Sequence, residues 1–380
     1  MDRRPLHVTM AIQTFAPIVG GGELQLERLL APLAERGIHT RVVTRAVPGV
    51  ARRGLAHGAD VMRTRVAGES PAASVTYVAG GLIDLARPGQ RVDVVHAHGV
   101  LSPATIALGA SFAGVPAVVT PLGAGAPGDL TRVQRKPGGR RRLRALVRRA
   151  NFVALSTELA NELYALGVDP ERVHLIPNGF DARRFRPASA AEQEQGRRAL
   201  DLPHGRFCFV FVGRLHAVKR VETAICALAS VPDAELIVVG DGPELASLER
   251  VAANVGVMPR VRFVGVSDRV DEYLRAADAF VLPSLAEGMS NALVEAMACG
   301  LPCLVTASIS GVDELLGTDR GDVVASGDVD AWAGAMRRLR DDQPRAQRLG
   351  AAAARYVHES MSLDHTADRL AALYRKLARR

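Results

Sequence analysis

Short apolar segments alternate with helical segments along the whole chain, and this alternation constrains the fold more than any other feature. Continuous apolar strands separated by helices are typical of parallel sheets that carry helices on both faces. The alternation runs in two series, and each predicts one doubly wound α/β domain. The predicted strands are residues 6–12, 39–45, 60–66, 92–99, 116–122, 151–156 and 173–179 in the first series, and 207–213, 235–240, 261–265, 279–284 and 302–306 in the second.

A polar segment, FRPASAAEQEQGRRALDLP, interrupts the pattern between the two series. A chain of 380 residues is also too long for one ordinary core. We therefore predict a first domain over residues 1–190, a second over 191–360 and a terminal helix within 361–380. Ligands of open α/β sheets bind at the carboxyl ends of the strands, so the expected site is a cleft between the two domains.

Composition excludes some classes of protein. No run of about 18 apolar residues predicts a membrane-spanning helix, and the short apolar run at the N-terminus leads straight into a strand. The four cysteines have no metal-type spacing and are predicted to be buried free thiols in a reducing, cytoplasmic compartment. They are Cys208, Cys226, Cys299 and Cys303. The formal charge of +8 comes almost wholly from arginine, so each of the three lysines carries more information than a single arginine.

Several common site motifs are missing from the sequence. There is no P-loop and no G-x-S-x-G nucleophile elbow. The glycines that follow the first strand are separated from it by seven residues, and no acid ends the second strand, so a dinucleotide fingerprint is not formed. His96 and His98 are closely spaced on a strand, but no third ligand accompanies them. A metal site is therefore not expected.

The segment GRLHAVK follows the first strand of the second series. Gly213 allows the backbone to turn, and Arg214 and Lys219 then lie at the carboxyl end of that strand. Two cations at this position suit a diphosphate, which needs neutralisation and several hydrogen-bond donors. A surface helix start with incidental charge is the alternative interpretation.

Two further glycine-rich segments begin helices. In GDGPE, Asp241 and Gly242 either form a wall of a nucleotide pocket or simply start a helix. Gly21 and Gly22 precede a helix predicted over 23–36, where backbone amides can bind an anion. A plain tight turn needs only one glycine, which favours the anion-binding interpretation.

The segment LAEGMSNALVEAMACGLP holds two acids with seven residues between them. We predict Glu287 on a loop, with Ser290 or Asn291 as the N-cap of a helix that ends near Cys299 and Gly300. Glu295 then lies about one turn into the helix, and the amides of residues 288–291 face the cleft. A capped helix with an acid in its first turn is the alternative.

Together these motifs resemble the family-4 retaining glycosyltransferases, which have the GT-B fold of two Rossmann-like domains facing a cleft. The resemblance covers nearly the whole chain. The segments that carry it are GGGELQLERLLAPLAERG, DVVHAHG, IPNGFDARRFRP, GRLHAVK, VGDGPE, RFVGVSD and the E-x7-E motif LAEGMSNALVEAMACGLP. Such enzymes transfer a sugar from a nucleotide diphosphate with retention of configuration and without a metal. The resemblance implies no cofactor, only a donor substrate such as a UDP- or GDP-sugar.

The resemblance also implies roles for individual residues. Arg214 and Lys219 would bind the diphosphate, Glu295 the ribose hydroxyls and Glu287 the hydroxyls of the donor sugar. The first domain would hold the acceptor, and residues 263–270 would border the base. The terminal helix within 361–380 would cross back onto the first domain. The remaining expected donor-site residues are Gly21, Gly22, Gly213, Asp241, Gly242, Gly288, Met289, Ser290 and Asn291.

One position departs from the family pattern. Many members carry a histidine in a T-P-H-G loop near the reacting centre, whereas this sequence reads TPLG with Leu122 at that place. His98 could take a polar, catalytic role there. His96 and His98 could equally be core or loop residues.

Residues 132–149 contain nine basic residues. Leu143, Leu146, Val147 and Ala150 fall on one helical face, which predicts a basic amphipathic helix. Such a helix could lie at the inner face of an anionic membrane or bind a lipid-linked acceptor. A solvated helix packed by its leucines is the alternative, and nothing in the sequence supports nucleic-acid binding.

The leading functional hypothesis is a glycosyltransferase in the synthesis of surface polysaccharide, glycolipid or small-molecule glycosides. A second is another GT-B enzyme such as a nucleotide-sugar epimerase, which needs acid and base side chains around the sugar. A third is a basic binding protein without catalysis, which leaves the two acids and two cations at the strand ends unexplained.

Overall fold

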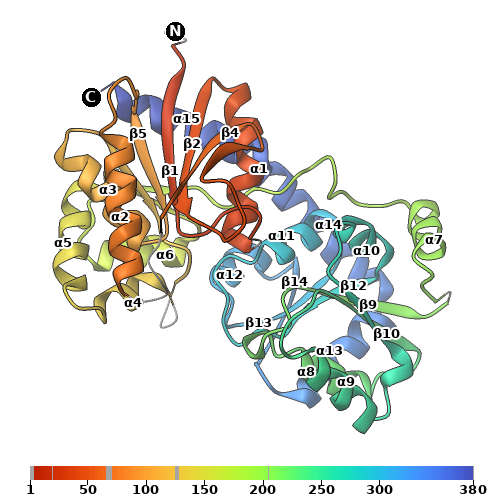
Figure 1. Cartoon of the computed structure of the whole chain (residues 1–380). Helices are drawn as coiled ribbons and strands as arrows, with labels where there is room; N and C mark the ends of the chain where they lie inside the picture. Colours follow the sequence, from red (N-terminus) through yellow and green to blue (C-terminus); the bar gives the residue numbers. More distant parts are fainter. Residues whose placement is uncertain (1–3, 19, 66–70, 125–127, 204, 380) are drawn as a thin grey trace. The chain divides into compact units, whose positions relative to one another are not determined.

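A computed structural model describes residues 4–18, 20–65, 71–124, 128–203 and 205–379 (Figure 1). The chain divides into two compact units, and each is described by itself. The first comprises the described residues up to Gly179 together with those from Leu363 onward, and the second runs from Phe180 to Ser362. Both units are parallel-sheet α/β domains, as the sequence predicts.

The first unit contains an eight-stranded sheet in the order β3-β4-β2-β1-β5-β6-β7-β8. Its strands are β1 (Leu6–Ile12), β2 (Ile38–Arg45), β3 (Arg53–Ala56), β4 (Ala59–Thr64), β5 (Val94–His98), β6 (Ala117–Thr120), β7 (Asn151–Ala154) and β8 (Val173–Leu175). The order reverses between β1 and β5, so the carboxyl ends of these two strands form a topological switch point.

One edge of this sheet was not predicted. Strand β3 pairs antiparallel with β4, whereas the other pairs in the sheet are parallel. His57 and Gly58, between the two strands, both have positive φ, 51° and 80° respectively. A two-residue type I′ hairpin turn requires positive φ at both of its central residues. The sequence does not predict this hairpin, because His-Gly is not one of the common hairpin dipeptides.

Helices cover both faces of the first sheet. Helices α2 and α3 pack together on one face, and α1 and α15 pack together on the other (Figure 1). Arg36, at the end of α1, forms ion pairs with Asp364 (3.0 Å) and Asp368 (2.6 Å) of α15. The helices are α1 (Gly21–Glu35), α2 (Pro71–Leu85), α3 (Ser102–Phe112), α4 (Asp129–Gln134), α5 (Gly139–Arg149), α6 (Thr157–Ala165) and α15 (Leu363–Ala378).

The second unit contains a parallel sheet in the order β11-β10-β9-β12-β13-β14. Its strands are β9 (Phe207–Val212), β10 (Ala234–Val239), β11 (Val261–Gly265), β12 (Ala279–Leu282), β13 (Cys303–Thr306) and β14 (Gly321–Val324). Its helices are α7 (Ala190–Ala199), α8 (Val221–Leu228), α9 (Leu245–Asn254), α10 (Val270–Ala276), α11 (Asn291–Ala298), α12 (Val312–Leu316), α13 (Val329–Asp341) and α14 (Gln343–Ser360). The switch point lies between β9 and β12.

The boundary between the units precedes the predicted one at residue 190. Phe180 and Phe185 are each 1% exposed and belong to the core of the second unit, together with Phe209, Phe280 and Trp332. Large buried side chains therefore place residues 180–189 in the second unit, although the polar sequence that follows suggests a later break.

The cysteines are free thiols, and Cys208, Cys299 and Cys303 are buried while Cys226 is half-buried. Burial raises the pKa of each of these thiols. In the described ranges, no helix is both long enough and apolar enough to cross a membrane.

Candidate active site

The two glycine-containing loops at the carboxyl ends of β9 and β10 pack backbone against backbone. The Leu215 amide donates to the Asp241 carbonyl (2.9 Å). A Cβ at Gly240 would lie 2.0 Å from the Gly213 carbonyl oxygen, and one at Gly242 would lie 2.2 Å from that of Leu215. Side chains at these two positions would separate the loops, so their glycines are required by close packing. The structure thus brings Gly213, Asp241 and Gly242 together.

Lys219 and Glu287 form an ion pair at the switch point of the second unit. Lys219 ends a short 3-10 turn (Ala217–Lys219) after β9, and Glu287 lies on the loop after β12. The Lys219 Nζ donates to Glu287 Oε1, and Ser284 Oγ donates to the same oxygen (2.8 Å). The side chains of Lys219 and Glu287 are only 20% and 14% exposed. Sequence reasoning assigned both residues to the donor but did not predict that they hold each other.

Arg214 begins the loop that Lys219 ends. Its side chain is exposed, and it makes no hydrogen bond or ion pair with any described part of the chain. Lys219 has three N–H donors, of which one goes to Glu287. The loop after β9 therefore offers one exposed guanidinium and one partly buried ammonium to a ligand.

The segment from Glu287 to Glu295 has the predicted local structure. Ser290 is the N-cap of α11, and its Oγ accepts a hydrogen bond from the Leu293 amide (3.3 Å). The helix ends at Cys299, followed by Gly300 with a φ of 78°. Gly288, Met289 and Asn291 are half-buried around this cap, and Glu295 is 5% exposed within the helix.

Helix α1 of the first unit begins earlier than predicted. It starts at Gly21, so Gly21 and Gly22 form its first turn instead of a loop before it. Glu23 is also in this turn and accepts a hydrogen bond from Thr14 Oγ1. A Cβ at Gly20 would lie 2.4 Å from a Glu23 carboxylate oxygen, so this glycine leaves room for the acid. The predicted anion-binding helix end thus already holds one carboxylate of its own.

His96 is a core residue. Its Nδ1 lies 2.6 Å from the Tyr374 hydroxyl of α15 and its Nε2 lies 2.7 Å from Thr120 Oγ1. Burial lowers the pKa of His96 well below its ordinary value. A neutral imidazole has one donor and one acceptor nitrogen, and the two hydroxyls satisfy both.

His98 ends β5 and stacks on His96, with ring centroids 4.5 Å apart. Its Nε2 is buried and has no hydrogen-bond partner among the described residues. Burial lowers the pKa of His98 to about 4, so the imidazole is neutral at pH 7. Of the two histidines, His98 is the one with an unpartnered ring nitrogen, and that nitrogen is buried.

A small pocket of about 40 Å³ lies at the carboxyl ends of the strands of the first unit, where ligands of such sheets bind. Gly22, His98 and Leu122 line it, and Leu122 is 43% exposed. A Cβ at Gly22 would lie 3.7 Å from Leu122 Cδ1, so the leucine side chain covers the start of α1. Its other lining residues are Gln25, Leu29, His96, Thr120, Val153, Leu155, Ile176, Pro177, Asn178, Thr366 and Leu370.

Asp129 is a residue that sequence reasoning missed. One carboxylate oxygen accepts hydrogen bonds from the Val100 amide (2.8 Å) and the Leu122 amide (3.3 Å). It thereby fixes the loop after β5 and the loop after β6 relative to each other. Burial raises the pKa of Asp129, although these backbone hydrogen bonds oppose the shift. The only signal in the sequence is an acid three residues before the predicted basic helix. Residues 125–127 of the preceding glycine-rich segment lie outside the described residues.

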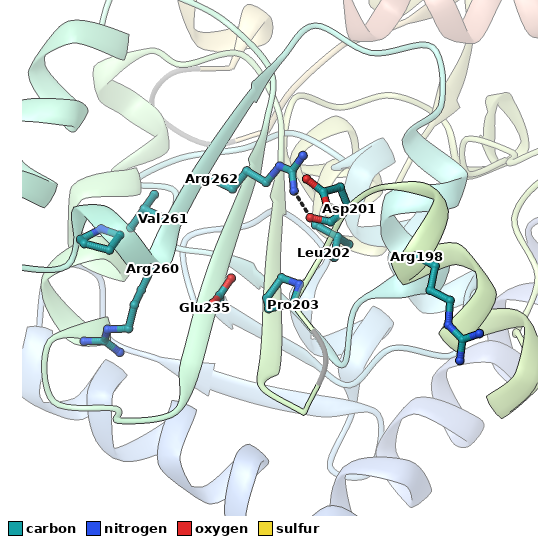
Figure 2. A pocket seen from close by; sticks show the side chains of 9 residues that line it. Arg198, Asp201, Leu202, Pro203, Glu235, Arg260, Val261 and Arg262 are labelled. Atoms are coloured by element: carbon teal, nitrogen blue, oxygen red, sulfur yellow. Dashed lines mark hydrogen bonds between the residues drawn. The ribbon is translucent and has the colours of Figure 1, made fainter.

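A larger pocket in the second unit is not part of this site. It has a volume of about 600 Å³ and lies at the amino ends of β10 and β11, opposite the candidate residues (Figure 2). Arg262 donates to the Asp201 carbonyl, and Arg260 donates to the Val231 carbonyl (2.7 Å). Its arginines are thus used for internal bonds, and none of the predicted site residues lines it.

Among the residues that the structure describes, no group of three or more histidine, cysteine or acidic side chains is placed to hold a metal ion. What the two switch points offer is charge and hydrogen bonding. The loops of the second unit present two cations and Glu287, while Glu295 is buried in α11. The first unit presents a neutral imidazole beside an apolar side chain.

Comparison with known proteins identifies the family. A family described as Glycosyl transferases group 1 matches residues 192–356, and one described as Glycosyl transferase 4-like domain matches residues 20–179. The D-inositol 3-phosphate glycosyltransferase of Salinispora tropica is 30% identical over 93% of this chain and 80% of its own length. The chain belongs to the group 1 glycosyltransferases.

Solved structures of other proteins show the same fold. Sucrose-phosphate synthase from Thermosynechococcus elongatus superposes with a TM-score of 0.80 at 22% identity, over 98% of this chain and 99% of that one. Anabaena HepE in complex with UDP-glucose superposes with a TM-score of 0.79 at 19% identity, over 98% and 100% of the two chains. The GT-B fold predicted from the sequence is therefore confirmed for this glycosyltransferase.

Proposed function

We propose that this glycosyltransferase is a metal-independent, retaining enzyme of family 4 with an E-x7-E motif. It transfers a sugar from a UDP- or GDP-sugar to an acceptor hydroxyl in the synthesis of surface polysaccharide, glycolipid or small-molecule glycosides. The observation that carries the proposal is the clustering of Arg214, Lys219 and Glu287 on the loops of one switch point. UDP-glucose bound to HepE, a protein of the same fold, supports the choice of donor. The comparisons favour neither an epimerase nor a binding protein without catalysis.

In this proposal, the second unit binds the donor. Arg214 and Lys219 neutralise the diphosphate and the charge that develops on it as it leaves. Glu287 orients the Lys219 ammonium and accepts hydrogen bonds from the sugar hydroxyls, while Glu295 accepts them from the ribose. The backbone amides of residues 288–291 and the Gly213 and Asp241–Gly242 loops complete the donor site.

The chemical step needs no protein nucleophile. The bond between C1 of the sugar and the diphosphate oxygen breaks with its electrons going to the diphosphate. The acceptor oxygen bonds to C1 on the same face, and its proton passes to the departing phosphate. The first unit binds the acceptor, and His98 contributes a neutral imidazole there.

A thermal-denaturation screen with UDP-, GDP- and ADP-sugars tests donor binding. The matching nucleotide sugar at about 100 times its Kd is expected to stabilise the protein by roughly 2.7 kcal/mol. The Glu295→Gln variant is expected to bind it roughly 10-fold more weakly, because a hydrogen bond to a charged group is lost.

Glu249→Gln, which alters an exposed acid on α9 of the same unit, is the matched control and should bind like the wild type. The proposal is wrong if no nucleotide or nucleotide sugar raises the melting temperature. Wild-type affinity in Glu295→Gln would contradict only the proposed contact between Glu295 and the ribose.

We also propose that helices α4 and α5 place this enzyme at the cytoplasmic face of an anionic membrane, where it meets a lipid-linked acceptor. The single basic helix predicted over 132–149 is two helices, because Pro137 and a left-handed Gly138 (φ 69°) interrupt it. Leu143, Leu146 and Ala150 are buried within the protein, as the alternative of a helix packed by its leucines expects, so a membrane would meet only the basic face. Eight basic side chains of this segment are exposed, and none of them forms an ion pair within the described chain. They are Arg132, Arg135, Lys136, Arg140, Arg141, Arg144, Arg148 and Arg149.

Vesicle sedimentation tests membrane contact. Binding to phosphatidylglycerol-containing vesicles is expected at low salt and is expected to weaken strongly at about 0.5 M salt, because screening shortens the reach of surface charges. Changing Arg140, Arg141 and Arg144 to glutamine should weaken vesicle binding at least 10-fold, because each basic charge near the membrane surface contributes about 1 kcal/mol of binding free energy. The triple variant at Arg250, Arg348 and Arg355, exposed arginines of the second unit, removes the same charge and should bind like wild type. Equal binding by both triple variants would contradict the assignment to α4 and α5.

A further inference from the structure

The pocket beside Leu122 offers a ligand little hydrogen bonding, because the polar side chains on its wall already have partners. Thr120 bonds to His96 (2.7 Å), and Thr366 donates to the Pro177 carbonyl (3.1 Å). The amide of Gln25 bonds to the backbone of Gly179, and Asn178 also has a partner within the chain. The imidazole of His98 is the exception, with its Nε2 unpartnered among the described residues.

The rest of the wall is apolar. Leu29, Leu155 and Ile176 are 4%, 8% and 5% exposed, and Leu122 stands at the opening with 43% of its surface exposed. The pocket volume is about 40 Å³. Because one water-sized group needs roughly 10–15 Å³ measured in this way, there is room for about three non-hydrogen atoms. The pocket therefore fits a short fragment that is apolar except at one point.

We propose that this pocket receives the methyl group of a 6-deoxy sugar, with the neighbouring ring hydroxyl on the His98 side. The inference rests on the proposed function, since it names the sugar that the enzyme handles. A hydroxymethyl group would carry its oxygen among leucine and isoleucine side chains, where it loses its hydrogen bonds to water and gains none. A methyl group in the same place loses nothing and buries apolar surface.

Leu122 decides this preference. A histidine at this place, as in the T-P-H-G loop, would add a hydrogen-bonding group at the opening of the pocket. Leucine removes that group and adds apolar surface over Gly22 and Gly99, whose Cβ positions lie 3.7 Å and 3.6 Å from Leu122 Cδ1. Asp129 accepts a hydrogen bond from the Leu122 amide and so holds the backbone of this loop at the opening of the pocket.

The sugar in the pocket can be the transferred sugar or a sugar of the acceptor, and two series of ligands distinguish them. The donor series compares UDP-6-deoxyglucose with UDP-glucose and GDP-6-deoxymannose with GDP-mannose by calorimetric titration. The acceptor series compares the methyl glycosides of the same four sugars by saturation-transfer NMR with UDP or GDP present. In the series that matches the sugar held in the pocket, the 6-deoxy member is expected to bind roughly 10-fold more tightly than its hydroxymethyl counterpart. Its methyl protons should receive the strongest saturation in the NMR series.

Variants at Leu122 complete the test. Leu122→Gln is expected to abolish the preference for the 6-deoxy member, and the volume-conserving Leu122→Met is expected to keep it. The residue is partly exposed, so both variants should fold, as a melting curve will verify. Equal or tighter binding of the hydroxymethyl member in both series, with UDP or GDP still bound, overturns this inference and leaves the proposed function intact. If neither nucleotides nor nucleotide sugars bind at all, the proposed function fails together with it.

Discussion

Replacing Lys219 with alanine is expected to lower turnover about 100- to 1000-fold, the usual effect of removing one group that stabilises charge in the transition state. Two physical effects add. The diphosphate loses an ammonium group, and the largely buried Glu287 carboxylate loses the cation that compensates it. In the variant the donor therefore meets the unpaired Glu287 carboxylate, whereas in the wild type it meets the Lys219–Glu287 ion pair. Turnover is measured with the nucleotide sugar that stabilises the wild type best, and donor affinity by calorimetry.

Arg250→Ala is the matched control for this change, because it removes an exposed cation from α9 of the same unit. It should leave both turnover and donor affinity unchanged. Glu287→Gln separates the two effects: the ammonium stays, but its ionic partner is gone. Wild-type turnover and affinity in Lys219→Ala would show that the loop after β9 is not the donor site.

Replacing Gly242 with alanine is expected to destabilise the second unit by roughly 3 kcal/mol, the upper part of the usual range for overpacking. Its Cβ would lie 2.2 Å from the Leu215 carbonyl oxygen, and a backbone atom cannot move aside as a flexible side chain can. The two loops would separate and the hydrogen bond from Leu215 to Asp241 would break. The melting temperature should fall by roughly 10 °C, and the amides of β9 and β10 should exchange faster with deuterium.

Gly334→Ala, within helix α13 of the same unit, is the control for a glycine that can accept a side chain. Its Cβ would meet only the far end of the Arg338 side chain, at 3.6 Å. Alanine is the better helix former, so this variant should be as stable as the wild type or slightly more stable. A Gly242→Ala protein that melts like Gly334→Ala would show that the loop contact does not constrain the fold.

Sequence reasoning succeeded where the cause is local. The alternation of apolar and helical segments predicted both sheets, and the small polar residues predicted an N-cap at Ser290 or Asn291, which the structure places at Ser290. Both features depend on neighbouring residues, which a sequence displays directly. The helix start at Gly21 and the break at Gly138 are also local, but glycine permits a helix end, a turn or a first helical turn, so its presence alone did not decide between them.

The missed features depend on partners distant in the chain. Lys219 and Glu287 are separated by 68 positions, and His96 and Tyr374 by 278. Each residue suggests an interaction, but the sequence does not show which partner the sheet order supplies. The same holds for Asp129, whose role depends on the loops after β5 and β6 meeting at one edge of the sheet. Apart from Asp129, the residues of the candidate site could therefore be named from the sequence, whereas their pairing could not.

The return of the last helix to the first unit has a consequence for synthesis on the ribosome. Strands β1 and β5 are translated before the second unit, but α15, which packs on both, is translated after it. Until it emerges, His96 lacks the Tyr374 hydroxyl and the Leu370 and Leu373 side chains that α15 buries are missing from the first unit. The second unit is one continuous segment, Phe180–Ser362, so it can fold before α15 is made. A nascent chain stopped before Leu363 should therefore resist protease from Phe180 to Ser362 and remain sensitive in the part that precedes Phe180.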